Sequence, residues 1–293
     1  MDRLARLCPH PMVGRAAALD DAPRARTHPG WPWVLMGGVA LTLVASGALA
    51  TRPGAAPPAS PAQPRIEARL AADLPVTDLG WVRMRDHGTV TIGDRAGQGD
   101  GLGDLLVAAD TTLAPGGAFP VHRHAGIEVV TIVLDGTLSL DEGGRSTELP
   151  AGTVHVIAAG AGVQHTEANH GAAPARFVQL WLASRAADRA PASEHVGGAA
   201  GADLAPLPLA LVSPDVQVRR ATLAAGATAH WSVARGRVAY VVCADGAIEL
   251  DTVHLGDGDG ATLTDGRFVA TAGATPATVI VVDLPAPPEP AAR

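Results

Sequence analysis

The chain has 293 residues, enough for two domains of ordinary size. Hydrophobic residues make up 47% of it and aromatic residues only 3%, so any core must be built mainly from Val, Leu, Ile and Ala. The formal net charge is −7, and all 22 basic residues are arginines scattered along the chain. We therefore expect no nucleic-acid partner, because the sequence has neither a basic stripe nor an aromatic platform.

An uncharged apolar segment, WPWVLMGGVALTLVASGALA, occupies residues 31–50. It is long enough to cross a bilayer as a helix, and the residues before it carry five arginines against three aspartates. The positive-inside rule then leaves the rest of the chain outside the cytoplasm, on a single-pass protein of the cell membrane. Residues 48–50, Ala-Leu-Ala, also fit a signal-peptidase site, so a cleaved signal and a secreted or periplasmic product is the alternative.

The remainder of the chain has the composition of a β protein. Short apolar runs such as IEVVTIVLDG and ARFVQLWLA are separated by turns rich in Gly, Pro and Asp. The stretch LAPG at residues 113–116 matches LAAG at 223–226, and Asp-Gly at 135–136 matches Asp-Gly at 245–246. Both matches have an offset of 110 residues, which indicates that one β domain is duplicated.

Two pairs of polar residues in the first copy have the spacing of metal ligands. Residues i and i+2 of a strand point to the same face, so His122 and His124 can direct two imidazoles at one point, as can His165 and Glu167. A lone His-x-His pair is usually solvated surface, but two pairs in one domain favour a catalytic transition metal. We expect Fe(II), with Mn, Ni, Cu and Zn as alternatives. At the offset of 110, the first two histidines correspond to Ser232 and Ala234, so we expect no metal in the second copy.

These residues match a known family. Gly116-(x)5-His122-x-His124-(x)3-Glu128, which runs on to a glycine at 136, resembles the first cupin motif, and Gly162-(x)2-His165-(x)3-Asn169 resembles the second. The surrounding segments are similar to those of pirins, which are bicupins, and in particular to bacterial pirins of the quercetinase type. The resemblance runs from about residue 80 to 286. It implies an all-β fold of two antiparallel cupin (jelly-roll-like) β-barrels in tandem after the N-terminal segment. It also implies a metal in the first barrel only, with His122, His124, His165 and Glu167 as ligands.

Two further residues are candidates for positions beside the metal. Glu128 stands one residue closer to His124 than the glutamate of many metal cupins. Because a shift of one residue turns a strand side chain to the opposite face, we expect Glu128 to miss the metal unless a bulge restores its direction. His155, in TVHVI, faces either the interior or the solvent. In the interior it could relay protons beside the metal, and otherwise it is a structural histidine.

The expected segments follow in chain order. They are a cytoplasmic segment (1–30), a transmembrane anchor or signal peptide (31–50), a Pro/Ala-rich linker (51–72) that ends in a helical turn, an N-terminal metal-binding cupin domain (73–187), a linker (188–205), a C-terminal degenerate cupin domain without metal ligands (206–286) and a tail (287–293).

The resemblance implies a function as well. We expect an Fe(II)-dependent dioxygenase-like oxidoreductase acting on a small enolic or phenolic, quercetin-like substrate, with Glu167 as both ligand and proton acceptor. One departure is that residues 86–110 contain no Phe, Tyr or Trp, although the relatives carry several aromatic residues there. The alternative is a non-enzymatic, metal-dependent redox sensor or binding module outside the cytoplasmic membrane, and a vestigial site is a third reading. The sequence does not predict the oligomeric state.

Overall fold

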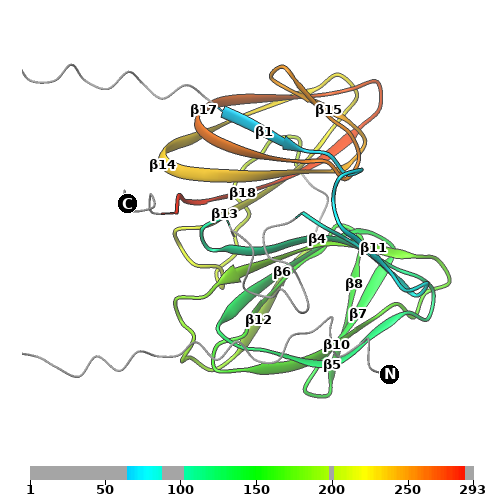
Figure 1. Ribbon diagram of the computed structural model, residues 1–293. Helices are drawn as coiled ribbons and strands as arrows, with labels where there is room; N and C mark the ends of the chain where they lie inside the picture. The colour runs from blue at the N-terminus through cyan, green and yellow to red at the C-terminus, as the bar shows by residue number, and fades with distance from the viewer. Residues whose placement is uncertain (1–64, 88–101, 198–200, 288–293) are drawn as a thin grey trace, which may run out of the picture. The chain divides into compact units, whose positions relative to one another are not determined.

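The computed structural model describes residues 65–87, 102–197 and 201–287 (Figure 1). Within these ranges the chain forms strands β1 to β18 and no α-helix, which confirms the all-β prediction. None of the described segments is a helix of the length and apolarity that a membrane span requires. The predicted anchor or signal peptide at residues 31–50 lies outside the described residues.

The first half of the fold consists of two antiparallel sheets. One has seven strands in the order β12-β9-β6-β11-β4-β3-β2, and the other has four in the order β5-β10-β7-β8. The strands of the larger sheet are β2 (Val76–Asp78), β3 (Val82–Asp86), β4 (Leu105–Leu113), β6 (Ile127–Asp135), β9 (Val154–Ala158), β11 (Ala175–Ala183) and β12 (Ala192–Val196). Those of the smaller sheet are β5 (Ala118–His124), β7 (Thr137–Glu142), β8 (Arg145–Pro150) and β10 (Val163–Ala168).

The two sheets of the first half pack face to face. A single cluster of buried side chains, which we call the sandwich core, draws on both of them. Its members include Phe119 from β5, Leu138 and Leu140 from β7, Val129 and Val133 from β6, and Phe177 from β11. The pairing gives open sheets, so the predicted closure of this half into a barrel is not observed among the described strands.

The other face of the seven-stranded sheet is also buried. Along β6, Val129 points into the sandwich core, whereas Val130 and Ile132 point to a second cluster that contains residues of both halves. We call this cluster the shared core, and it includes Val156, Leu180, Tyr240, Val242 and Ile280. Burial on both faces explains why β6 is an almost continuous apolar run rather than an alternating one.

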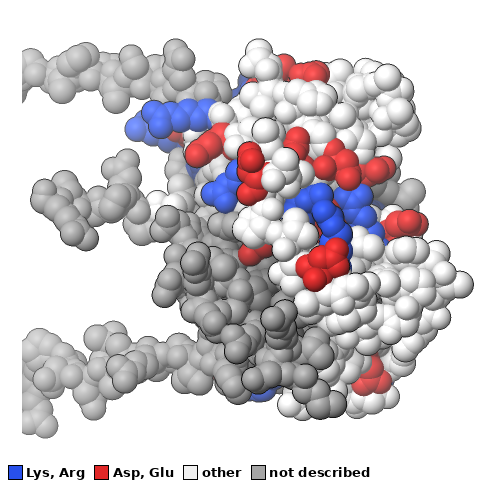
Figure 2. Space-filling model, turned by 45° about the vertical axis from the view of Figure 1, so that its right-hand side comes forward, with Lys and Arg blue, Asp and Glu red and all other residues white. Residues whose placement is uncertain are grey.

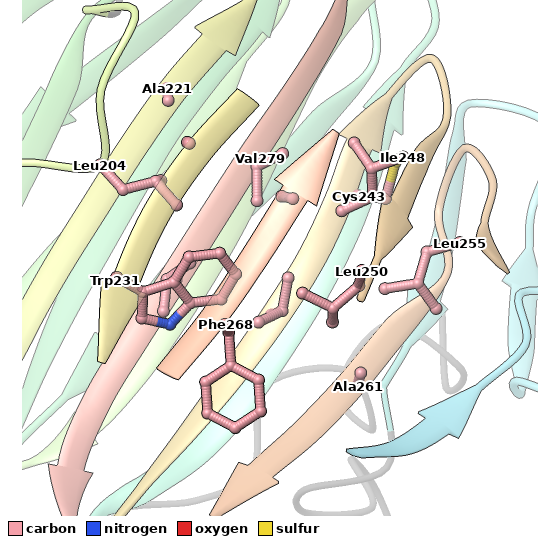
Figure 3. Close-up of a cluster of buried hydrophobic side chains, with 14 of the residues drawn as sticks. Leu204, Ala221, Trp231, Cys243, Ile248, Leu250, Leu255, Ala261, Phe268 and Val279 are labelled. Atoms are coloured by element: carbon pink, nitrogen blue, oxygen red, sulfur yellow. The ribbon is translucent and has the colours of Figure 1, made fainter. Parts of the chain in front are cut away.

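The second half forms one seven-stranded antiparallel sheet. Its order is β13-β18-β14-β17-β15-β16, and β1 pairs with β17. The strands are β13 (Gln217–Leu223), β14 (Thr228–Asp245), β15 (Ile248–Leu250), β16 (Val253–Leu255), β17 (Gly260–Ala272), β18 (Ala277–Pro285) and β1 (Arg65–Arg69). The inner face is filled by an apolar cluster in which Trp231, Phe268, Leu250 and Leu255 lie close together (Figure 3).

Two predicted linkers are wrong in part, because each contains a strand. Residues 65–69, inside the expected linker 51–72 and its helical turn, form β1, and Ile66 packs against the apolar cluster of the second half. Residues 192–196, inside the expected linker 188–205, form β12 and pair with β9. Both are edge strands whose sequences are mostly polar, and such strands gain their stability from backbone pairing rather than from an apolar pattern.

The internal duplication is visible in the turns. Gly136 and Gly246 both have positive φ, of 70° and 75°. A Cβ atom on either one would collide with the backbone of a Pro-Ala pair, Pro174 and Ala175 in the first half and Pro276 and Ala277 in the second. The same backbone geometry at the same place in both halves supports one ancestral unit.

Charged side chains of opposite sign are interspersed on the face that Figure 2 shows. An ion-pair network also joins the two halves. Arg176 bonds Asp110 at 2.7 Å and Asp257 at 2.8 Å, and Asp110 also pairs with Arg85 at 3.2 Å. The network fixes β11 and β4 of the first half against the loop before β17 of the second.

A buried histidine makes the stability of the fold depend on pH. The ring Nδ1 of His87 lies 3.0 Å from the hydroxyl of Tyr240 in the shared core. Burial, the largest cause, lowers the pKa of His87 to about 4. The unfolded chain binds a proton near its ordinary pKa of about 6.5, well before the folded protein does. The free energy of unfolding should therefore fall as the pH drops from about 7 to 4.

This prediction can be checked by denaturant unfolding across that pH range. A His87→Gln variant, which keeps a hydrogen-bonding group near Tyr240 but cannot titrate, should show a shallower decline than the parent. The matched control is His170→Gln, which makes the same substitution at an exposed histidine and should leave the slope unchanged. Equal slopes for the parent and His87→Gln would contradict the prediction.

Candidate metal centre

Three histidines converge between the two sheets of the first half. His122 on β5 lies directly opposite His165 on the neighbouring strand β10, and His124 follows two residues later. One ring nitrogen from each lies within 4.8 Å of the others. Among the described residues, no other group of three or more His, Cys, Asp or Glu side chains brings its ligand atoms this close together. All three histidine side chains are buried.

A bulge in β5 sets this convergence. Phe119 pairs with Glu167 and His122 pairs with His165, so β5 advances three residues where β10 advances two. The extra residue leaves Val121 65% exposed, while Phe119, His122 and His124 all point inward. Such a bulge redirects the side chains that follow it without breaking the pairing.

The hydrogen bonds of the cluster set the direction of its lone pairs. The Nδ1 of His122 lies 2.8 Å from the carbonyl oxygen of Pro120, which cannot donate, so this nitrogen carries the proton. The Nε2 of His122 is then an acceptor, and it lies 2.7 Å from the Nε2 of His165. The Nε2 of His124 and the Nδ1 of His165 are buried without a hydrogen-bond partner.

The electrostatics of the site favour neutral imidazoles. Burial lowers the pKa of all three histidines, to about 3 for His124 and to about 2 for His165. For His122, the hydrogen bond to the carbonyl of Pro120 raises the pKa and so partly opposes the effect of burial. Neutral rings with free lone pairs are the form that binds metal ions. Three such nitrogens fit a divalent transition metal held by imidazoles. The convergence of these three buried imidazoles is the observation that makes them the candidate metal site.

Glu167 lies on the same inward face of β10 but is not a member of the group of ligand atoms within 4.8 Å. It is 3% exposed, and its Oε1 accepts a hydrogen bond of 2.7 Å from the Nε2 of Gln179. Burial raises the pKa of Glu167 to about 7, against the opposing effect of the bond from Gln179. With His122 it lines a cavity of about 30 Å³. Its role as a fourth ligand remains a prediction.

Glu128 points away from the histidines. It lies on the face of β6 that Val130 and Ile132 share, opposite the sandwich core. Its carboxylate accepts hydrogen bonds from the hydroxyls of Ser184 and Ser213 and from the backbone N–H of Ser213. The bulge that could have restored its direction is not next to Glu128, because the pairing of β6 with β11 is regular from Ile127 to Val133 and shifts only beyond Val133. This placement gives Glu128 no position beside the histidines.

His155 faces the interior, which decides between the two orientations that the sequence left open. It is 2% exposed, and Ile157, on the same face of β9, belongs to the sandwich core. The Nε2 of His155 lies 3.7 Å from a carboxylate oxygen of Glu142, whose backbone pairs with that of His165. His155 therefore occupies a polar layer next to the histidine cluster.

The sequence analysis missed two residues of the site, Gln179 and Trp181. The ring of Trp181 packs edge-on against His124 with centroids 4.9 Å apart, and its indole N–H donates to the Oε1 of Gln179 at 2.8 Å. This bond orients the amide so that its Nε2 faces Glu167. A glutamine in the otherwise apolar strand ARFVQLWLA was the available signal.

The second half has apolar side chains at the positions of the ligands. Trp231 on β14 lies opposite Phe268 on β17, in the same way that His122 on β5 lies opposite His165 on β10. The ring centroids of Trp231 and Phe268 lie 5.9 Å apart (Figure 3). The predicted correspondence with Ser232 and Ala234 is wrong by one residue, because β14 lacks the bulge of β5. The inward residues are Trp231 and Val233, and neither is a metal ligand.

Comparisons with known proteins agree with this fold and site. The family model of pirin matches residues 93–182, and that of the quercetinase C-terminal cupin domain matches residues 210–284. The chain belongs to the pirin family. Together the two matches span more than half of it, which confirms the resemblance found in the sequence motifs.

Relatives match over most of their length. A pirin-like protein of Caulobacter vibrioides is 29% identical over 223 residues, which is 70% of this chain and 94% of the relative. The quercetin 2,3-dioxygenase of Escherichia coli is 25% identical over 194 residues, or 63% of this chain and 84% of that protein. The crystal structure of the bacterial pirin YhhW of Escherichia coli with nickel(II) has a TM-score of 0.69 at 23% identity, and the match covers 76% of this chain and all of that one (100%).

The candidate metal centre predicts which residues this pirin needs in order to bind a metal ion. Replacing His122 and His124 with alanine removes two of three imidazoles, so the purified protein should lose nearly all of the stoichiometric metal that the parent retains. Elemental analysis after gel filtration measures this directly. The control is His230→Ala with His254→Ala, two exposed histidines of the second half, which should leave the metal content unchanged. Equal metal in the parent and the His122/His124 variant would refute the site.

Proposed function

We propose that this pirin is a metal-dependent dioxygenase that acts on a small enolic or phenolic substrate. The observation that carries the proposal is the combination of three buried histidines with a buried carboxyl group, Glu167, which lines a small cavity together with His122. Iron(II) is the proposed metal, since a site of imidazoles with a carboxylate nearby suits it. The nickel(II) in the structure of YhhW makes nickel an alternative. The quercetin 2,3-dioxygenase name of a relative supports the reaction class.

The histidines would hold the ion, and the ion would supply Lewis-acid activation of a substrate oxygen and a binding place for dioxygen. His122 is positioned for this by its bond to the carbonyl of Pro120, which keeps its Nε2 free. The edge of Trp181 covers His124 and limits the access of water to it. These contacts pre-orient the ligands before an ion arrives.

Glu167 is the group that we propose as the acceptor of the substrate's hydroxyl proton, and also as the fourth ligand. A carboxyl group with a pKa of about 7 can take up a proton near neutral pH. The bond from Gln179 holds the carboxylate at the cavity that it lines with His122. Trp181 in turn fixes Gln179, so two side chains of β11 set the position of a carboxylate oxygen of Glu167 on β10 of the facing sheet.

The cavity has an apolar wall. Met84 on β3 and Val107 and Ala109 on β4 pack together and against Trp181, and all four line the cavity. This wall favours a weakly polar substrate over a highly charged one, and the cavity of about 30 Å³ is large enough for a hydroxyl group directed at Glu167. The alternative of a non-enzymatic sensor has less support, because a sensor does not require a proton acceptor beside the metal.

We also propose that residues 31–50 hold the protein in the cell membrane with its folded halves outside the cytoplasm, unless they are removed as a signal peptide. The charge distribution around this segment supports the orientation. The mass of the mature N-terminus distinguishes the two cases.

Oxygen consumption tests the proposed reaction. Iron-loaded protein supplied with quercetin or a simple catechol should consume oxygen, and Glu167→Gln should slow turnover by roughly 10²–10⁴-fold because the amide cannot accept the proton. Metal content should be measured in the same samples, so that loss of the ion is separated from loss of the base. Glu148→Gln, at an exposed carboxylate of β8, is the matched control and should turn over at the parent rate. Absence of oxygen uptake at full metal occupancy would contradict the proposal.

A further inference from the structure

A second cavity lies on the side of the seven-stranded sheet that faces away from the histidines. Its volume is about 400 Å³, within the range of small-molecule sites. It is lined by Glu128 and Ala158 at the ends of β6 and β9, by Ser184 and the chain that follows it, and by residues 210–214 before β13. None of these residues takes part in the metal centre.

The floor of this cavity contains a buried carboxylate. Glu128 is 3% exposed, and its three hydrogen bonds come from the hydroxyl of Ser184 and from the hydroxyl and backbone N–H of Ser213, at 2.8 to 3.0 Å. All three donors are uncharged. A carboxylate offers about four acceptor positions, so one remains for a group that enters the cavity. Because a buried charge is costly without an opposite charge, this remaining position favours a cationic donor.

The charges at the rim do not satisfy Glu128. Arg185 also lines the cavity, but it is exposed and pairs with Asp104 at 3.4 Å and with Asp215 at 3.1 Å. Arg189 is exposed as well, where solvent and salt screen its charge. Among the described residues, the hydrogen-bond donors to the Glu128 carboxylate therefore include no cation.

The walls are aliphatic. Ala158 lies directly opposite Glu128 across the β6–β9 pair, and Leu211, Val212 and Pro214 contribute the facing surface. We propose that this cavity binds a small aliphatic amine, with its ammonium group on the carboxylate of Glu128 and its alkyl chain against these side chains. The site is separate from the metal centre because side chains of Glu128 and of the histidines lie on opposite faces of the larger sheet.

Calorimetric titration of the metal-loaded full chain tests this with three probes of equal length: n-butylammonium, n-butanol and butyrate. We expect saturable binding of n-butylammonium, weaker binding of n-butanol and none of butyrate. The His122→Ala/His124→Ala variant should bind n-butylammonium as the parent does, which excludes coordination of the amine to the metal. Absence of saturable binding, equal binding of butyrate, or loss of binding in this histidine variant would overturn the proposal.

Two substitutions locate the site within the parent protein. Glu128→Gln keeps the shape of the side chain but removes its charge, and it should weaken n-butylammonium binding by about tenfold or more. Ala158→Leu fills the cavity beside Glu128 and should abolish binding of both the amine and the alcohol. A variant counts as folded if its midpoint of denaturant unfolding equals that of the parent. Unchanged affinity for n-butylammonium in a folded variant would refute the site. If neither is folded, the comparison of the three probes on the parent protein remains decisive.

Discussion

The antiparallel pairing of β5 with β10 is the constraint on which the site of this pirin depends. It sets His122 opposite His165, and the bulge at Val121 turns His124 and Phe119 to the same interior. Burial in that interior keeps the three rings neutral, and the carbonyl of Pro120 fixes one of them with its lone pair directed inward. Geometry, protonation state and tautomer thus follow from one pair of strands and the sheet that covers them.

The seven-stranded sheet of the first half separates two environments. Its inner face carries Gln179, Trp181 and His155 toward the metal centre, while its outer face carries Glu128 toward the second cavity. The alternation of side chains along a strand is sufficient to achieve this separation. The second half supports the sheet through the shared core, and in it Trp231 and Phe268 occupy the positions that correspond to His122 and His165.

Much of the centre could be predicted from the sequence, because its signals are local. Two histidines at i and i+2 share a face in any strand, and counting positions was enough to expect Glu128 on the opposite side. The bulge in β5 could not be predicted, since a shift in pairing leaves no periodic trace, and for this reason the equivalence with Ser232 was wrong by one residue. The edge strands β1 and β12 were missed because their side chains are mostly polar. The orientation of His155 and the bond from Gln179 to Glu167 depend on contacts between strands that are distant in sequence.

The central claim is that three neutral histidines of the first half bind one metal ion and that the second half binds none. A crystal structure of the metal-loaded protein, with anomalous scattering recorded at the absorption edge of the metal, tests it most directly. The structure predicts a single anomalous peak bonded to the Nε2 of His122 and to ring nitrogens of His124 and His165, with no peak near Trp231. A peak elsewhere, or a metal bonded through the Nδ1 of His122, would contradict it.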